Sequence, residues 1–196
     1  FNHPNKVAEQ ILGKSRKTLV KVTNAGEMWE LDEKKIDSLV ISDLVNFDSN
    51  IHRNFLSPVL EHPKVNFTFI AIPPFPKLFW KTRKLTRASG YFEDLAYIRR
   101  FVKKVATYQN VEIYGFGTAM FTNDLRLYKD NKHYHIAVNE FMLNAISLKT
   151  NRLTKENIDE YLVEFDRAIN TYSLPKKWYP KKQGRKKTKE LNIDEA

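Results

Sequence analysis

Two residues late in the chain have the types and the spacing needed to move a proton. Asp130 and His133 lie in the polar segment 128–135 and are three residues apart. A histidine at this spacing can bond one ring nitrogen to the carboxylate, which fixes its tautomer and leaves the other nitrogen free as a general base. This pair is the base-and-orienting half of a nucleophilic triad. The alternative interpretation is that Asp130 caps a turn and His133 is an ordinary surface histidine.

Three further patterns precede this pair in a defined order. They are the turn Asn24-Ala25-Gly26, the segment 37–41 followed by Asn46, and the apolar run ending in Pro73-Pro74. With the late Asp-x-x-His, this order resembles the SGNH (GDSL-type) esterases and acyltransferases. The resemblance implies that His133 is the base, that Asp130 orients it, and that Gly26 and Asn46 supply amides to an oxyanion hole. Each amide donor has an alternative interpretation, because Gly26 and Asn46 also suit an ordinary turn or cap.

A closer resemblance is to the extracytoplasmic SGNH-like proteins that act beside membrane O-acyltransferases, including the teichoic-acid D-alanyl transfer protein. It is carried by His3-Pro4 and by the run 72–80, in which Pro73-Pro74 precedes an aromatic-rich loop. It implies a cell-envelope glycan or acyl donor as the partner, a membrane O-acyltransferase beside it, and an anchor outside this chain. A cytoplasmic location is the alternative. Candidate substrate-binding residues are Phe75, Trp80 and Tyr134, although these rings could equally pack on the core.

The nucleophile is where the chain departs from that pattern. No Gly-Asp-Ser or Gly-Ser-Ser occurs, and Ser15 precedes the first expected strand instead of following it. We therefore expect the nucleophile and the first strand to lie upstream of Phe1. Otherwise the chain is a non-catalytic member of the fold that binds a glycan or a partner. As given, it is not expected to turn over an ester.

The amino-acid composition and charge exclude several other classes of function. The 196 residues contain no cysteine, which removes disulfides and thiol chemistry, and no spacing typical of a cofactor or metal site is present. The net charge is +10, and residues 175–196 hold eight Lys/Arg against three Asp/Glu, a net of +5. We interpret 175–196 as a disordered basic tail whose segment Lys176–Lys189 could meet an anionic surface. Nucleic-acid binding is a weaker alternative, because the body is only mildly basic.

Alternating apolar runs and helical stripes predict one α/β domain over residues 1–174. We expect a three-layer sandwich with a mostly parallel sheet flanked by helices, SGNH-like and lacking its first strand. The expected strands are 18–22, 38–42, 65–72 and 111–116, and the expected helices are 6–12, 51–60, 92–108, 136–148 and 155–172. In such sheets, ligands bind at the carboxyl ends of the strands. Glu160, Glu164 and Asp166 are expected to form the solvated face of the last helix.

Overall fold

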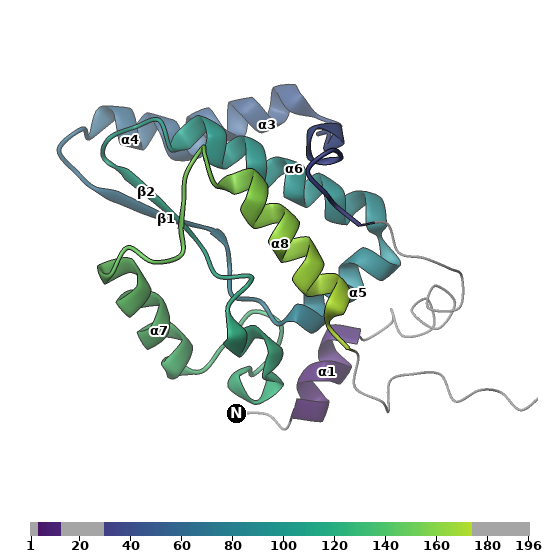
Figure 1. Cartoon of the computed structure of the whole chain (residues 1–196). Coiled ribbons are helices and arrows are strands. Elements are labelled where there is room, and N and C mark those ends of the chain that lie inside the picture. Colours follow the sequence, from purple (N-terminus) through teal and green to yellow (C-terminus); the bar gives the residue numbers. More distant parts are fainter. Residues whose placement is uncertain (1–3, 13–29, 174–196) are drawn as a thin grey trace, which may run out of the picture.

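A computed structural model describes residues 4–12 and 30–173 (Figure 1). Within them the chain forms a small three-stranded sheet flanked by helices, so the expected mixed α/β architecture is confirmed. β1 (Phe67–Ile72) runs parallel to β2 (Val111–Gly115), and the short β3 (Arg152–Leu153) pairs antiparallel with β2. The strand order is β1-β2-β3, and α5 (Lys77–Thr86) and α6 (Ala88–Val105) connect the parallel pair.

Successive side chains of a strand point to opposite faces of the sheet, and helices cover both faces here. Phe69 points to the face covered by α6, where its ring lies 5.9 Å from that of Phe101. Tyr114 belongs to the opposite face and packs with Met142 of α7 (Ile136–Ser147). α8 (Ile158–Thr171) contacts α5 and α6. Figure 1 shows α7 on one side of the strands and α6 and α8 on the other.

The helix expected at 51–60 is present, but it begins earlier. It consists of α3 (Leu44–Ile51), a π-helical turn η3 (His52–Leu56) and α4 (Ser57–Glu61). Asp43 caps its start and accepts a hydrogen bond from Asn46 N at 3.1 Å. Pro58 cannot donate to the preceding turn, and the wider π-turn directly before it accommodates the proline ring.

Two local expectations are wrong. Residues 38–42 form no strand: the 3-10 turn η2 (Ile36–Ser38) is followed by extended residues that lie against α6, and Val40 is 74% exposed. That run is apolar but has no neighbouring strand among the described residues. The segment expected as an aromatic-rich loop is instead the helix α5, which begins directly after Pro76. The strand expected at 18–22 lies outside the described residues.

The helix expected at 6–12 is present and packs against segments from the middle of the chain. α1 (Pro4–Leu12) packs on α5 and on the 3-10 turn η5 (Leu125–Leu127), which follows η4 (Met120–Asn123). After β2, Gly117 allows close packing of α8, because an added Cβ would lie 2.7 Å from Ile72 Cγ2 and still closer to Phe165. No helix in the described part of the chain is long and apolar enough to cross a bilayer.

Candidate functional site

The loop 128–135 is fixed beside the carboxyl end of β1. Its first residue, Tyr128, is fully buried and donates its hydroxyl to the carbonyl of Pro74 at 2.7 Å. Burial raises the pKa of Tyr128, so the hydroxyl remains a donor. At the other end of the loop, His135 N donates to Leu127 O at 2.7 Å. The segment therefore leaves and rejoins the domain at two fixed points, at the edge of the sheet where a ligand is expected.

Between these points the two carboxylate oxygens of Asp130 contact different groups. Oδ1 accepts hydrogen bonds from the backbone N–H groups of Lys132 and His133, at 2.8 and 2.9 Å, and closes a tight turn. Oδ2 lies 2.7 Å from Nδ1 of His133. Asp130 thus caps the turn, and the same turn brings the imidazole onto its carboxylate.

The electrostatics of the pair suit an orienting carboxylate. Burial raises the pKa of Asp130, but hydrogen bonds from Lys132 N and from the ring and backbone of His133 outweigh it and lower the pKa to about 2. The side chain of His133 is 73% exposed, and that of Asp130 is 28% exposed. Within the described residues the imidazole has no hydrogen-bond partner besides Asp130. Its second nitrogen is therefore accessible to a reacting group from solvent.

The candidate oxyanion-hole residues are not brought to this pair by the described structure. Gly26 lies outside the described residues. Asn46 lies in the first turn of α3, at the opposite end of the molecule from the loop 128–135, and its side-chain amide donates to Asp43 Oδ2 at 2.6 Å (Figure 1). No serine within 4–12 or 30–173 is a hydrogen-bond partner of His133. The described site is thus a dyad.

The three candidate substrate-binding rings are all at least half-buried, but in two places. Tyr134 is paired with Tyr128 across the loop and packs against the hydrophobic clusters on either side of it. Phe75 and Trp80 lie together on the other side of Pro74, with Trp80 only 5% exposed. Tyr134 therefore shapes the dyad loop, whereas Phe75 and Trp80 belong to a separate aromatic cluster.

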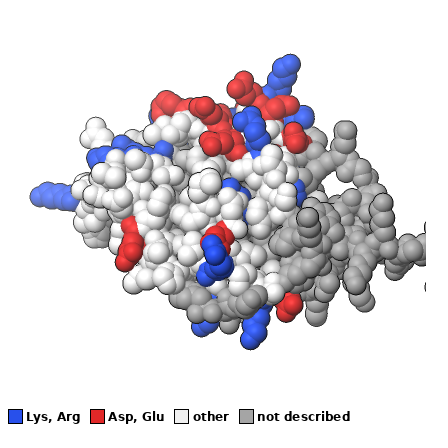
Figure 2. Space-filling model, turned by 60° about the horizontal axis from the view of Figure 1, so that its bottom comes forward, with Lys and Arg blue, Asp and Glu red and all other residues white. Residues whose placement is uncertain are grey.

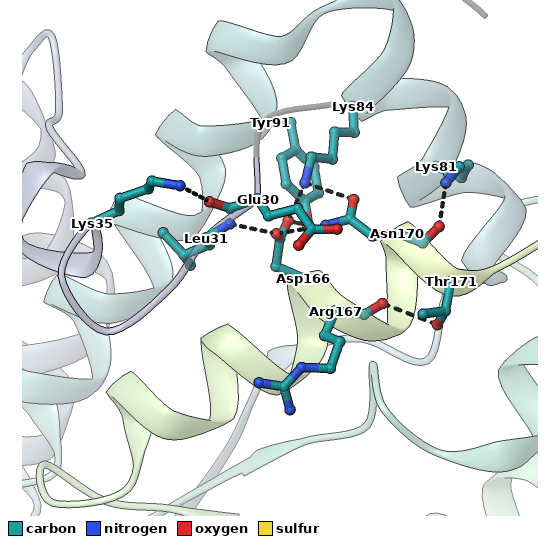
Figure 3. A network of polar contacts seen from close by, with 10 residues as sticks. All are labelled: Glu30, Leu31, Lys35, Lys81, Lys84, Tyr91, Asp166, Arg167, Asn170 and Thr171. Carbon is teal, nitrogen blue, oxygen red and sulfur yellow. Dashed lines mark hydrogen bonds and ion pairs between the residues drawn. The ribbon is translucent and has the colours of Figure 1, made fainter. Parts of the chain in front are cut away.

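A second polar constellation, shown in Figure 3, was not foreseen from the sequence. Asp166 is fully buried, so its assignment to the solvated face of the last helix is wrong. Its Oδ1 accepts from Lys84 Nζ at 2.6 Å and Tyr91 hydroxyl at 2.9 Å, and its Oδ2 accepts from Leu31 N at 2.8 Å and Asn170 Nδ2 at 3.1 Å. The carboxylate joins α5, α6, α8 and the chain at Leu31.

Lys81 and Lys84, the lysines near Asp166, are both buried. Burial lowers the pKa of Lys84, although the hydrogen bond to Asp166 opposes this. Burial and the nearby charge of Lys84 lower the pKa of Lys81 to about 8. Every oxygen of Asp166 is engaged by the protein itself, and this leaves no position for a substrate. We interpret this network as structural.

Neither constellation resembles a metal site. No group of three or more His, Asp or Glu side chains in the described ranges could hold an ion. The Asp130–His133 contact on the exposed loop suits acid–base chemistry, of the kind in which a histidine transfers a proton for an external nucleophile.

Comparison of the chain with protein-family models, with curated proteins and with solved structures gives no match.

Proposed function

We propose that this chain is part of an SGNH-like esterase or O-acyltransferase that acts on a cell-envelope polysaccharide, with His133 as the base and Asp130 as the residue that orients it. The observation that carries the proposal is the 2.7 Å contact between His133 Nδ1 and Asp130 Oδ2, on a loop fixed beside the carboxyl end of a parallel strand. The resemblance in motif order supplies the reaction class. It also suggests an extracytoplasmic location beside a membrane O-acyltransferase.

In the proposed reaction a serine hydroxyl attacks an acyl-ester carbonyl. Nε2 of His133 takes the serine proton as the new C–O bond forms, and returns it to the leaving sugar hydroxyl as the old ester bond breaks. Asp130 holds the ring through Nδ1 and stabilises the imidazolium formed in between. The acyl-enzyme is then resolved by water or by an acceptor hydroxyl. The proposal locates the serine outside the described residues, since none of the described serines contacts His133.

The test uses the full-length protein. Hydrolysis of p-nitrophenyl acetate and labelling by a fluorophosphonate probe are measured for wild type, His133→Ala and Asp130→Asn. We expect each variant to lower kcat/KM by about 10²- to 10⁴-fold, because proton transfer and its orientation are lost. His135→Ala is the matched control: it removes a histidine of the same loop, one that caps α7 through Ala137 N at 3.2 Å. Undiminished hydrolysis by His133→Ala contradicts the proposal.

A second candidate is a non-catalytic glycan-binding module of the same fold. The observation that favours it is the lack of a serine partner for His133 in the described part of the chain. This candidate predicts that the full-length protein is not labelled by the fluorophosphonate and that glycan binding is unchanged in His133→Ala.

Nucleic-acid binding has less support from the described surface. Figure 2 shows Lys and Arg interspersed with Asp and Glu, with a wide uncharged area between them, on the face it displays. Several of the described cations are also paired, such as Arg100 with Asp48 at 2.7 Å. Binding by the basic tail would weaken steeply with added salt.

A further inference from the structure

The contact between α5 and α8 buries more positive than negative charge. Among the described residues the buried Lys, Arg, Asp and Glu side chains are Lys77, Lys81 and Lys84 of α5 and Asp166 of α8. The three lysines are 6, 8 and 2% exposed, and their spacing of four and three residues places them on one face of the helix. A buried charge without a counter-ion destabilises a fold. One buried carboxylate therefore leaves two of the buried ammonium groups without a buried counter-ion.

The hydrogen bonds show which lysine depends on its charge. Lys84 Nζ lies 2.6 Å from Asp166 Oδ1, so a carboxylate holds its ammonium group. Lys81 Nζ instead donates to the backbone carbonyl of Asn170 at 2.7 Å. This acceptor carries no net charge, and an amine that has lost its proton still has N–H groups to donate. Lys81 can therefore become neutral and keep its contact, whereas Lys84 cannot.

The charges that face Lys81 come from three segments. Lys84, on the same helix, repels its ammonium group, whereas Asp166 of α8 and Glu30 attract it. Figure 3 shows Lys81 at the edge of this network, with Asn170 between it and Asp166. Burial, followed by the repulsion from Lys84, outweighs the two attractions and lowers the pKa of Lys81 to about 8. Lys77 is less affected by Asp166, and the charge of Glu164 favours its ammonium form.

From this arrangement we infer that Lys81 makes the α5–α8 contact pH-sensitive, so that α8 is held more firmly at mildly alkaline pH than at neutral pH. Asn170 joins the parts: its carbonyl accepts from Lys81, and its side chain accepts from Lys84 at 2.8 Å and donates to Asp166 at 3.1 Å. Loss of the Lys81 proton removes the repulsion from Lys84 and leaves all these bonds in place. The inference concerns the fold and is independent of the proposed reaction.

The direction of the effect follows from proton binding. A lysine in an unfolded chain has a pKa of about 10.4. Between about pH 8 and pH 10.4 the unfolded chain holds a proton that the folded chain has released from Lys81, so the fold gains stability as the pH rises. Below that range Lys81 is charged in both states, and the full cost of burying its charge remains. These two values predict that the unfolding constant falls about 10-fold from pH 7 to pH 9.

The experiment measures urea denaturation of the full chain at these two pH values. Wild type is compared with Lys81→Met, which keeps an apolar stem, and with Lys81→Gln, which also keeps an N–H donor for the Asn170 carbonyl. We expect both variants to lose the contribution of Lys81, so that their unfolding constants change about 10-fold less than that of wild type. Lys132→Met is the matched control, because it removes an exposed lysine and should retain the wild-type response.

NMR of ¹³C- and ¹⁵N-labelled lysine side chains observes the proton itself, with Lys81→Met identifying the Lys81 signal. We expect that signal to titrate at about pH 8 in the folded protein. The inference is overturned if Lys81 titrates near 10.4, if Lys81→Met and Lys81→Gln respond to pH as wild type does, or if Lys132→Met loses the response equally. Each of these outcomes leaves the test of His133 and Asp130 untouched.

Discussion

Two carboxylates organise this molecule, and they do so in opposite surroundings. Asp130 lies on an exposed loop and holds a histidine three residues away. Asp166 is fully buried and holds groups that are 75 to 135 residues away in the chain, from three other segments. The first carboxylate leaves a ring nitrogen open to solvent, whereas the second leaves nothing open. The comparison separates a group arranged to meet a ligand from a group arranged to hold elements together.

The surroundings also decide how much each pair stabilises the fold. Water screens the interaction of the mostly exposed His133 with Asp130, so its contribution is small. The side chains of Lys84 and Asp166 are 1% and 0% exposed. If one of them lost its partner, the other charge would remain buried with no water to solvate it, which strongly destabilises a fold.

The largest expected effect is that of Asp166→Ala. This change leaves the Lys84 ammonium buried without its counter-ion and also removes the acceptor of Leu31 N. We expect the free energy of unfolding, measured by urea denaturation, to fall by about 3–5 kcal/mol. Asp130→Ala is the matched control and should cost less than about 1 kcal/mol. Equal losses for the two variants would break the distinction between a structural and a functional carboxylate.

A smaller effect is expected for Tyr91→Phe, which removes one hydroxyl donor from Asp166 and keeps the ring. The Tyr91 hydroxyl lies 2.9 Å from Asp166 Oδ1, and burial together with the charge of Asp166 raises the pKa of that tyrosine well above its usual value. We expect a loss of about 1–2 kcal/mol, because Lys84 still satisfies the same oxygen. Tyr97→Phe, on the same helix but without a contact to Asp166, should have a smaller effect in the same denaturation experiment.

The two carboxylates also show what the sequence can and cannot predict. The Asp130–His133 contact was predictable because it is local: the spacing alone brings the groups together in a turn. Asp166 was misassigned because its partners are distant in the chain. A signal was present, since Asp166 is four residues after Leu162 and three before Ile169, both fully buried, and so lies on the apolar stripe of α8. A charge at such a position indicates a buried partner, but only tertiary packing identifies Lys84.

The same reasoning explains the helices and strands. Long periodic segments such as α6 and α8, and the alternating β1, were predictable from their own side chains. The run 38–42 was not, because an apolar run becomes a strand only where a neighbour supplies hydrogen bonds. The aromatic segment after Pro76 was misjudged because the expected loop came from the family resemblance, whereas the residues from Lys77 onward form a helix.

The smallest expected effect is that of Asp130→Asn, which changes the carboxylate of the dyad. The pKa of Asp130 is about 2 in the folded protein, below its unfolded value of about 3.9. A carboxyl group whose pKa is lowered by folding stabilises the fold above its unfolded pKa, and that contribution is lost as the pH falls through the folded pKa. We therefore expect Asp130→Asn to cost less than about 1 kcal/mol at pH 7, and this cost to fade as the pH falls through about 2. Urea denaturation at several pH values, with Asp130 titrated by carboxyl ¹³C NMR, measures both quantities. An Asp130 that titrates near 3.9 would mean that the turn and the histidine do not hold its carboxylate in solution, and the dyad would then lack its orienting residue.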